Sequence, residues 1–341
     1  MPTLPYRPHP ALRSGHLQTM MVGIICGHRP TYHAAQIEVA LRDGERLIVH
    51  EEEAAILPRN SDLVILIHGL GGDHRSPYLE RLARTANRAG FRAWRVDLRG
   101  CGAGLAHAWR PANAGRSDDL ADVLHMARTL HPEARIHIVG FSLSGNIVLK
   151  LLGELSASEH SAHHLVATSS KAPGLASAIA VAPPCNLRRC ADNMDRSSRW
   201  IYTSFYLKML RGQVEQRRNA WPRWNRVPRT PEPKSIRQFD ARYTAPLSGF
   251  PDPATYYAKS SSIDLLPKIK VPTTVILDQD DPIVPYATFA DAEFSPSTSV
   301  IVTRRGGHMG YFARDAQGRN YRWLEYVVLE VLKNSRFQVR P

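Results

Sequence analysis

The chain has 341 residues, and its 44 Lys and Arg against 31 Asp and Glu give a formal net charge of +13. Hydrophobic residues make up 43% and charged residues 22%, which excludes collagen-like, coiled-coil and largely disordered proteins. Four cysteines are too few for a disulfide scaffold. The sequence shows neither ~20 consecutive apolar residues nor a secretory signal pattern, so we expect a cytoplasmic protein with reduced thiols.

Apolar runs of strand length alternate with helical segments along most of the chain. This alternation predicts an α/β fold with a mostly parallel central sheet and helices on both faces. A turn at Asp43-Gly44 predicts an antiparallel hairpin of residues 37–41 and 46–51 at one edge. The other predicted strands are Leu63–Ile67, Phe91–Val96, Arg135–Val139, Ala176–Val181, Thr273–Leu277 and Ser299–Thr303. The predicted helices are Tyr78–Ala89 ended by Gly90, a helix capped by Ser117 that runs to Leu130, Leu143–Leu152 and Tyr321–Lys333.

One long segment between two predicted strands breaks this alternation. Residues 186–260 hold 15 Lys and Arg against 6 Asp and Glu, a net charge of +9, together with three of the six tryptophans. We interpret residues 186–262 as a basic helical cap over the C-terminal edge of the sheet, with a poorly ordered insertion as the alternative. Residues 1–185 and 263–341 then form the two parts of the core.

The segment Gly140-Phe141-Ser142-Leu143-Ser144-Gly145-Asn146 follows a predicted strand and opens a predicted helix. A nucleophile elbow needs this context, because a tight strand-to-helix turn raises the Ser hydroxyl above the sheet edge. Ser144 stands where G-x-S-x-G has its second glycine, and serine is among the least bulky substitutes there. The motif makes Ser142 the candidate nucleophile, with an incidental Gly- and Ser-rich helix cap as the alternative.

A carboxylate and a histidine follow the serine in the order of the α/β-hydrolase triad. One predicted strand ends in Asp278-Gln279-Asp280-Asp281-Pro282, and the last strand runs into Gly306-Gly307-His308. A serine hydroxyl becomes a competent nucleophile when a histidine accepts its proton and a carboxylate orients the imidazole. His308 is the candidate base. Asp281 is the favoured acid because Pro282 and the apolar residues after it fix its loop; Asp280 is its main competitor and Asp278 the weakest of the three.

A second glycine-rich loop, His68-Gly69-Leu70-Gly71-Gly72, follows the strand Leu63–Ile67. The backbone N–H groups of Leu70 and Leu143 are the predicted oxyanion hole. We interpret His68 as a structural residue that orients this loop. Neither G-x-x-x-x-G-K-[ST] nor G-x-G-x-x-G is present, which disfavours a phosphate or dinucleotide site. Cys185 and Cys190 have no second Cys or His pair, which disfavours a zinc site. Acyl transfer on the predicted triad requires neither a metal nor an organic cofactor.

These motifs together identify a family resemblance over nearly the whole chain. They are His16-Leu17-Gln18-Thr19, His68-Gly69-Leu70-Gly71-Gly72, Asp97-Leu98-Arg99-Gly100-Cys101-Gly102, the segment 140–146, Asp280-Asp281-Pro282 and Gly306-Gly307-His308. The chain resembles the α/β-hydrolase superfamily and, within it, the YheT-like branch of esterases, to which the HLQT signature is specific. The resemblance implies a carboxylic ester hydrolase with Ser142, Asp281 and His308 as its triad.

The sequence therefore predicts a serine hydrolase that cleaves small-molecule carboxylic esters, with short- to medium-chain acyl groups, through an acyl-enzyme. Hydrolysis of a lipid, thioester or amide on the same triad is the first alternative, and a catalytically silent ligand-binding protein is the second. The basic cap allows a peripheral contact with anionic lipid. No nucleic-acid partner is expected, because no RNA-binding motif accompanies the basic residues.

Overall fold

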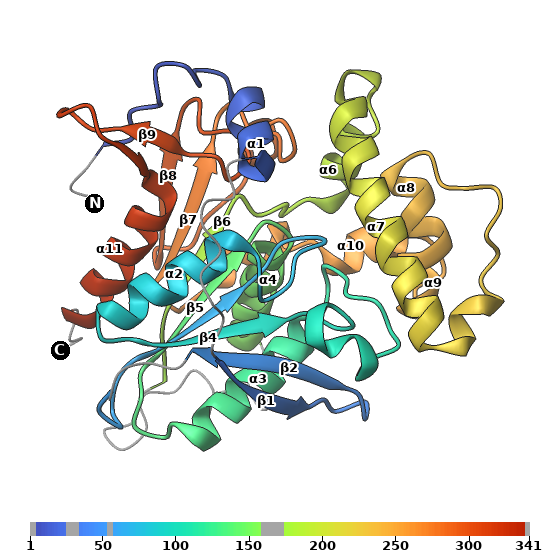
Figure 1. Cartoon of the computed structure of the whole chain (residues 1–341), viewed down its shortest axis with the longest axis horizontal. Helices are drawn as coiled ribbons and strands as arrows, with labels where there is room; N and C mark the ends of the chain where they lie inside the picture. Colours follow the sequence, from blue (N-terminus) through green and yellow to red (C-terminus); the bar gives the residue numbers. More distant parts are fainter. Residues whose placement is uncertain (1–4, 25–33, 53–56, 158–173, 338–341) are drawn as a thin grey trace.

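An eight-stranded sheet runs through the middle of the molecule, in a computed structural model that describes residues 5–24, 34–52, 57–157 and 174–337 (Figure 1). The strand order is β1-β2-β4-β3-β5-β6-β7-β8. The pairs β1–β2 and β2–β4 are antiparallel and the remaining pairs are parallel. The strands are β1 (Ala34–Ala40), β2 (Arg46–Glu52), β3 (Leu63–Ile67), β4 (Arg92–Asp97), β5 (Ile136–Phe141), β6 (Leu175–Val181), β7 (Thr273–Asp278) and β8 (Thr298–Thr303). The predicted α/β fold and its edge hairpin are confirmed.

Helices cover both faces of this sheet, and a small hairpin lies beyond its last strand. The α-helices are α1 (Gly15–Ile24), α2 (Pro77–Arg88), α3 (Ser117–Leu130), α4 (Leu143–Ala157), α6 (Leu187–Met194), α7 (Trp200–Ala220), α8 (Ile236–Phe239), α9 (Ala245–Leu247), α10 (Pro253–Ser260) and α11 (Trp323–Phe337). The 3₁₀-helical segments are η1 (Gly102–Ala106), η2 (Ser197–Arg199), η3 (Pro222–Arg226), η5 (Ile263–Lys268) and η6 (Tyr286–Phe289), and η4 (Asp240–Thr244) is a π-helical turn. The hairpin is β9 (Phe312–Arg314) with β10 (Asn320–Arg322).

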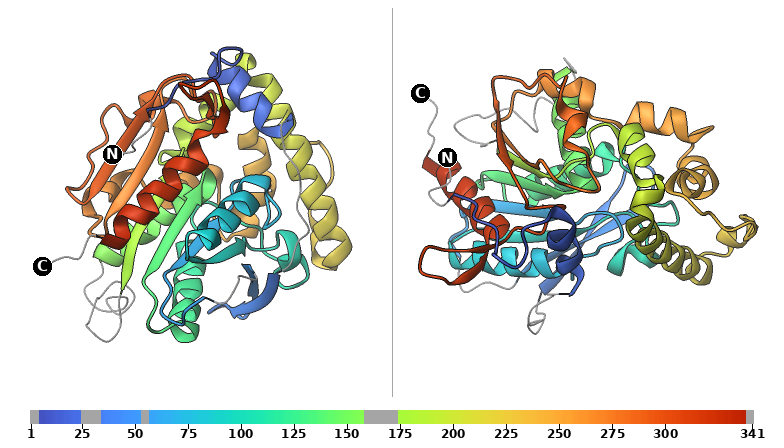
Figure 2. Two further views of the ribbon diagram at one scale, coloured as in Figure 1. Left: turned by 60° about the vertical axis from the view of Figure 1, so that its left-hand side comes forward. Right: turned by 90° about the horizontal axis from the view of Figure 1, so that it is seen from above.

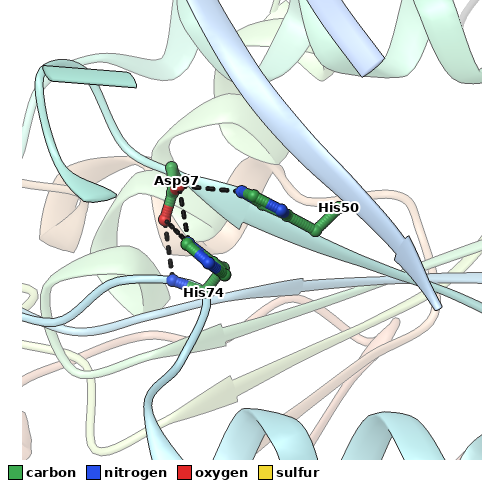
Figure 3. A group of neighbouring side chains, drawn as sticks. All are labelled: His50, His74 and Asp97. Carbon is green, nitrogen blue, oxygen red and sulfur yellow. Dashed lines mark hydrogen bonds and ion pairs between the residues drawn. The ribbon is translucent and has the colours of Figure 1, made fainter. Parts of the chain in front are cut away.

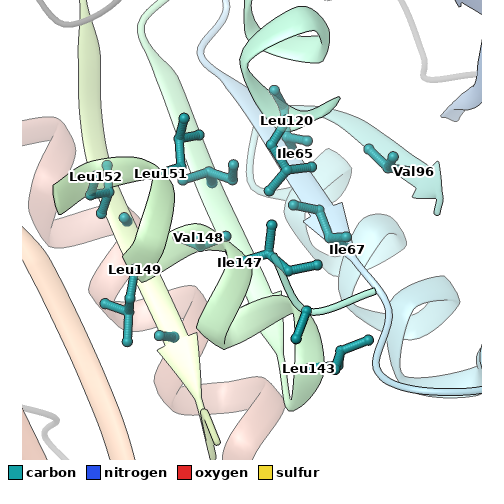
Figure 4. Close-up of a cluster of buried hydrophobic side chains, with 14 of the residues drawn as sticks. Ile65, Ile67, Val96, Leu120, Leu143, Ile147, Val148, Leu149, Leu151 and Leu152 are labelled. Atoms are coloured by element: carbon teal, nitrogen blue, oxygen red, sulfur yellow. The ribbon is translucent and has the colours of Figure 1, made fainter. Parts of the chain in front are cut away.

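The side chains of the central strands alternate between two hydrophobic cores. In β3, Leu63, Ile65 and Ile67 pack in the core with α3 and α4, whereas Val64 and Leu66 pack in the other core with α2 and α11. Figure 4 shows the first of these cores around α4. All five β3 side chains are fully buried, as expected of a strand with helices on both faces.

The segment between β6 and β7 folds into helices α6 to α10, which lie together at one end of the sheet (Figures 1 and 2). These helices have their own small core around Leu210, Trp224 and Tyr243. The division into residues 1–185, 186–262 and 263–341 remains a prediction. Among the helices that the structure describes, none is long and apolar enough to cross a membrane.

Two predicted helix starts are wrong, and both errors arise from partners distant in the sequence. Ser117 is not a cap but the first residue of α3. Its hydroxyl donates a hydrogen bond to the Glu154 carboxylate at 2.5 Å and accepts one from the Lys150 ammonium at 3.1 Å. Tyr321 lies in β10, where it pairs with Ala313, so α11 begins two residues later than predicted.

Candidate active site

Ser142 occupies a sharp turn between the central strand β5 and helix α4. Its φ of 52° lies in the left-handed region, which is rare for a residue with a side chain and is typical of strained functional turns. A Cβ on Gly140 would lie 2.3 Å from the carbonyl oxygen of Ser144, so the residue two before the serine must be glycine. The elbow geometry expected from the sequence is therefore present.

Ser144 shows why serine is tolerated at the second small position of this elbow. The side chain is fully buried, and its hydroxyl donates a hydrogen bond to the backbone carbonyl of His68 at 2.5 Å. The close approach of the chain falls at the following residue, Gly145, where a Cβ would lie 3.0 Å from Pro183. Ser144 thus links the elbow to the glycine-rich loop after β3.

The structure brings Ser142, His308 and Asp281 into one chain of hydrogen bonds at the carboxyl ends of β5, β7 and β8. The Ser142 Oγ lies 2.9 Å from His308 Nε2, and His308 Nδ1 lies 2.8 Å from Asp281 Oδ2. All three residues are buried, with exposed fractions of 5 to 8%. The imidazole can accept a proton from the hydroxyl on one side while the carboxylate holds its other nitrogen.

The three acids that compete in the sequence have different partners in the structure. Asp281 turns one oxygen toward His308, and its other oxygen accepts hydrogen bonds from the backbone N–H groups of Ile283 (2.8 Å) and Val284 (2.9 Å). Asp280 instead accepts the Gly15 N–H at 2.7 Å. Its other oxygen accepts the Gly307 N–H at 3.3 Å. The Asp280 carboxylate therefore holds helix α1 and the backbone before His308, and it does not contact the imidazole.

Asp278 supports the backbone that carries His308. Its carboxylate accepts hydrogen bonds from the N–H groups of Gly306 (2.8 Å) and Gly307 (3.1 Å). Burial and a hydrogen bond with the neighbouring Asp280 carboxyl raise the pKa of Asp278 to about 7. Burial is the main cause because it disfavours the charged carboxylate, and the nearby Asp280 carboxyl adds to the effect.

Helix α1 braces the His308 loop, a role that the sequence analysis did not assign. Thr19 Oγ1 accepts the N–H of His308 at 2.8 Å. The fully buried Gln18 side chain clasps the backbone of Phe312, accepting its N–H at 2.8 Å and donating to its carbonyl at 3.0 Å. Gly307 has a φ of 60°, and a Cβ there would lie 2.2 Å from the Gly15 carbonyl oxygen. The HLQT segment, residues 16–19, was the signal in the sequence that could have pointed to this bracing role.

The glycine-rich loop after β3 lies against the elbow. A Cβ on Gly69 would contact the Ser142 Cβ at 3.2 Å. The buried His68 lies 2.8 Å from the Gly69 carbonyl through Nδ1 and accepts the Leu98 N–H at Nε2, and burial lowers its pKa. Leu70 follows in this loop, and Leu143 opens α4, where the N–H groups have no partner within the helix. The oxyanion hole at Leu70 and Leu143 remains a prediction.

Two cavities meet at Ser142. The smaller has a volume of about 140 Å³ and extends under the cap between Leu143, Leu210 and Trp224. The larger has a volume of about 690 Å³ and is lined by side chains of α1, α2, α7 and α11, including Met20 and Phe205. Both cavities are lined mostly by apolar groups, and His308 faces only the larger one.

The tryptophans of the cap are largely tied to the core. The indole N–H of Trp221 donates to the Leu105 carbonyl at 2.8 Å, and that of Trp224 donates to the Trp109 carbonyl at 2.7 Å. The buried Arg217 beside them donates to the carbonyls of Arg99 and Arg110. Part of the basic, aromatic composition of the cap therefore serves packing rather than a nucleic-acid surface.

A second polar cluster, His50, His74 and Asp97, has the residue types of a metal site (Figure 3). The Asp97 carboxylate lies 2.9 Å from His50 Nε2 and 2.8 Å from His74 Nδ1, and it also accepts the backbone N–H groups of His74 and Ala103. Burial raises the pKa of Asp97, but these hydrogen bonds outweigh it and lower the pKa well below the usual range. The carboxylate has enough donors without a cation, so the cluster acts as a hydrogen-bonded tie between β2, β4 and the loop after β3.

The buried cysteines are poor nucleophiles. Burial raises the pKa of the Cys101 thiol to about 11 and that of the Cys185 thiol to about 12. The thiolate is the reactive form, so these groups stay inert near neutral pH.

Comparison with known proteins places the chain in a family. The sequence model of the α/β hydrolase fold matches residues 62–315. YheT of Escherichia coli is 25% identical over 87% of this chain and 84% of its own length. The medium-chain fatty acid ethyl ester synthase/esterase 2 of Saccharomyces cerevisiae is 28% identical over 79% of this chain and 61% of its own, and human phospholipase ABHD3 is 24% identical over 73% and 58%.

Solved structures show the same fold. Est1E of Butyrivibrio proteoclasticus with ferulic acid bound has a TM-score of 0.56 at 14% identity, covering 88% of this chain and 99% of its own. The Pyrococcus furiosus esterase Pf2001 also has a TM-score of 0.56 at 14% identity, covering 90% and 92%. The chain therefore belongs to the α/β-hydrolase fold family, in its branch of YheT-like esterases.

Proposed function

We propose that this protein hydrolyses carboxylic esters with short- to medium-chain acyl groups through an acyl-enzyme on Ser142. The observation that carries the proposal is the hydrogen-bonded series from Asp281 through His308 to Ser142, placed where two apolar cavities meet. The yeast relative named as a medium-chain fatty acid ethyl ester synthase/esterase supports the acyl length.

In the first step, the Ser142 hydroxyl attacks the ester carbonyl while His308 Nε2 takes its proton. Asp281 stabilises the imidazolium that forms and keeps Nδ1 protonated. The N–H groups of Leu70 and Leu143 bind the oxyanion, and each such donor lowers the barrier by about 2.7–4 kcal/mol.

The leaving alcohol takes the proton from His308 and departs into the larger cavity, because His308 faces that cavity. The acyl group then occupies the smaller cavity under the cap, which favours short or medium chains over long ones. His308 next activates a water molecule, which attacks the acyl-enzyme. The acid is released and the Ser142 hydroxyl is restored.

A fluorophosphonate probe tests the nucleophile, since it reacts with activated serines. We expect labelling of the wild type and of Asp280→Asn, and none of Ser142→Ala or His308→Ala. A panel of p-nitrophenyl esters of increasing acyl length then tests the specificity. Labelling of Ser142→Ala equal to the wild type contradicts the assignment, and a rate that keeps rising to long chains contradicts the acyl length.

Hydrolysis of lipid esters on the same residues is the second candidate. The volume of the larger cavity, about 690 Å³ between apolar side chains, favours it, because a bulky alcohol such as a lysophospholipid fits there. Two relatives, named as a human phospholipase and a yeast monoacylglycerol lipase, also support this candidate. Release of fatty acid from phosphatidylcholine or monoacylglycerol, compared with soluble esters, distinguishes the two candidates. Failure of every ester together with absent probe labelling indicates a silent ligand-binding protein.

A further inference from the structure

Most of the large hydrophobic side chains that are exposed in the described part of the chain gather on two helices. Leu17 and Met20 of α1 are each 45% exposed, and on α7 the exposed fractions are 65% for Trp200, 48% for Ile201 and 59% for Phe205. These are five of eight such side chains among the described residues. Contiguous exposed apolar groups of this kind mark interaction sites, whereas single ones do not.

The two helices contact each other at the mouth of the larger cavity. His16 Nδ1 of α1 lies 2.8 Å from the Tyr202 hydroxyl of α7, and their rings stack at 5.7 Å. The left view of Figure 2 shows α1 beside the start of α7. Met20, Ile201 and Phe205 also line the larger cavity, so the apolar surface continues into the passage that leads to Ser142. We call the surface of Leu17, Met20, Trp200, Ile201 and Phe205 the α1–α7 face.

Basic residues lie next to the α1–α7 face along the chain. Arg13 precedes α1, Arg196 and Arg199 precede α7, and Lys208 lies two turns into α7. No ion pair to any of these four cations is found within the residues that the structure describes. Residues 5–24 and 196–214 contain no Asp or Glu. The nearest acids are Glu215, which pairs with Arg218 and Arg229 near the end of α7, and Asp280, which accepts the N–H of Gly15 at the start of α1. The cations beside the face therefore outnumber the acids near it.

We propose that the α1–α7 face docks on the surface of an anionic lipid bilayer. An interfacial membrane contact combines large apolar side chains with nearby Lys and Arg. The apolar groups enter the headgroup region, and the cations attract anionic lipid. Docking in this way places the mouth of the larger cavity against the lipid. An ester can then reach Ser142 without crossing water, and this consequence alone rests on the proposed function.

A second copy of the chain fits this face less well than a lipid surface does. Two copies that met through it would bring the same cations together, and like charges at close range repel. They would also close the cavity mouths of both copies. Charge complementarity thus favours the anionic surface.

The experiment measures sedimentation of the Ser142→Ala protein with vesicles of phosphatidylcholine, with and without about one-third phosphatidylglycerol. We expect binding to the anionic vesicles only, weakened by added salt. The variant Leu17→Glu/Trp200→Glu changes two residues of the face that do not line either cavity. It should lower the partition coefficient at least about tenfold, since each buried side chain of this size contributes several-fold or more. Leu130→Glu, at an equally exposed position on α3, should bind like its parent.

A charge comparison completes the test. Arg13→Gln/Arg196→Gln/Lys208→Gln should weaken anionic binding about a hundredfold, since each cation near such a surface contributes about fivefold. Arg59→Gln/Lys268→Gln/Lys270→Gln removes as many exposed charges before β3 and β7 and should have little effect. Equal loss in both triple variants, undiminished binding of Leu17→Glu/Trp200→Glu, or no binding to anionic vesicles overturns the proposal.

Self-association is measured on the same proteins by sedimentation velocity. A dimer that Leu17→Glu/Trp200→Glu abolishes would overturn the lipid proposal in favour of a second copy. Each set of substitutions is also made with Ser142 retained. Fluorophosphonate labelling of these proteins is recorded in parallel and shows that the variants fold. Loss of labelling at wild-type Ser142 contradicts the proposed function but leaves vesicle binding as an independent result.

Discussion

The substitution Asp281→Asn tests the proposed triad through the tautomer of His308. Oδ1 of Asp281 accepts two backbone N–H groups, from Ile283 and Val284, and Oδ2 faces His308 Nδ1. An asparagine in this place must keep its carbonyl oxygen on the two N–H donors. Its NH₂ group therefore faces His308 and requires Nδ1 to be the acceptor. The imidazole proton then moves to Nε2, the nitrogen that faces Ser142.

A neutral imidazole that carries its proton on Nε2 cannot accept the serine proton. The arrangement of the three side chains is then kept, but His308 no longer acts as a base. We expect kcat for p-nitrophenyl butyrate to fall by about 10⁴, the effect of a wrong tautomer in such a triad. That factor corresponds to about 5 kcal/mol in the activation free energy. Since no side chain is removed, KM should change little.

Asp280→Asn is the matched control, because the Asp280 carboxylate accepts the Gly15 N–H and does not contact His308. It should retain kcat within about tenfold, the range expected when a positioning contact of ~1 kcal/mol is lost. The reasoning is refuted if Asp281→Asn keeps more than about a tenth of wild-type kcat at equal folding, or if Asp280→Asn is the more damaging of the two.

Three further outcomes are expected. Thr19→Val removes the acceptor of the His308 N–H and should lower kcat about tenfold at an unchanged fold, with Thr19→Ser restoring it; equal Thr19→Val and wild-type rates contradict the bracing role. The pKa of Asp278, about 7, lies above its unfolded value near 4, so this group's contribution to stability is lost as pH rises from about 4 to about 7. Asp280→Asn removes the neighbouring carboxylate and should make that fall shallower in urea denaturation at several pH values; a slope as steep as the wild type's contradicts a contribution of Asp280 to the raised pKa. Asp97→Asn breaks a fully buried cluster and should lower the free energy of unfolding by about 3–5 kcal/mol. A chelator should leave the wild-type Tm unchanged, whereas a Tm that drops with chelator means that the cluster holds a metal.

Local pattern was enough to predict the strands that form the core of the fold. β3 is observed at the predicted residues because a short run of five apolar residues, three of them β-branched, is typical of a strand with helices on both faces. The turn at Gly90 and the elbow at Ser142 were also predictable, since each is a short segment whose backbone conformation depends on its own residues.

Contacts between distant segments account for what the sequence did not predict. α1 lies in a stretch with many prolines, and its residues find their partners about 265 to 294 positions away, at Asp280 and Phe312. The β9–β10 hairpin has three residues in each strand, too few for a periodic signal. Ser117 has a good capping residue type, but the Glu154 carboxylate on α4 takes its hydroxyl. Apart from the HLQT segment of α1, none of these pairings leaves a local trace in the sequence.

The attachment of the His308 loop to α1 means that the proposed base is held by a segment 289 positions earlier in the chain. A nascent chain that stops short of residue 308 carries Ser142 without this base, and a protein that has lost α1 keeps both side chains without the contact that braces the histidine loop. Catalytic competence would thus arise late in synthesis, only after α1 has met this distant loop. Proteolytic removal of α1 would in turn lower the activity while leaving Ser142 and His308 in the chain.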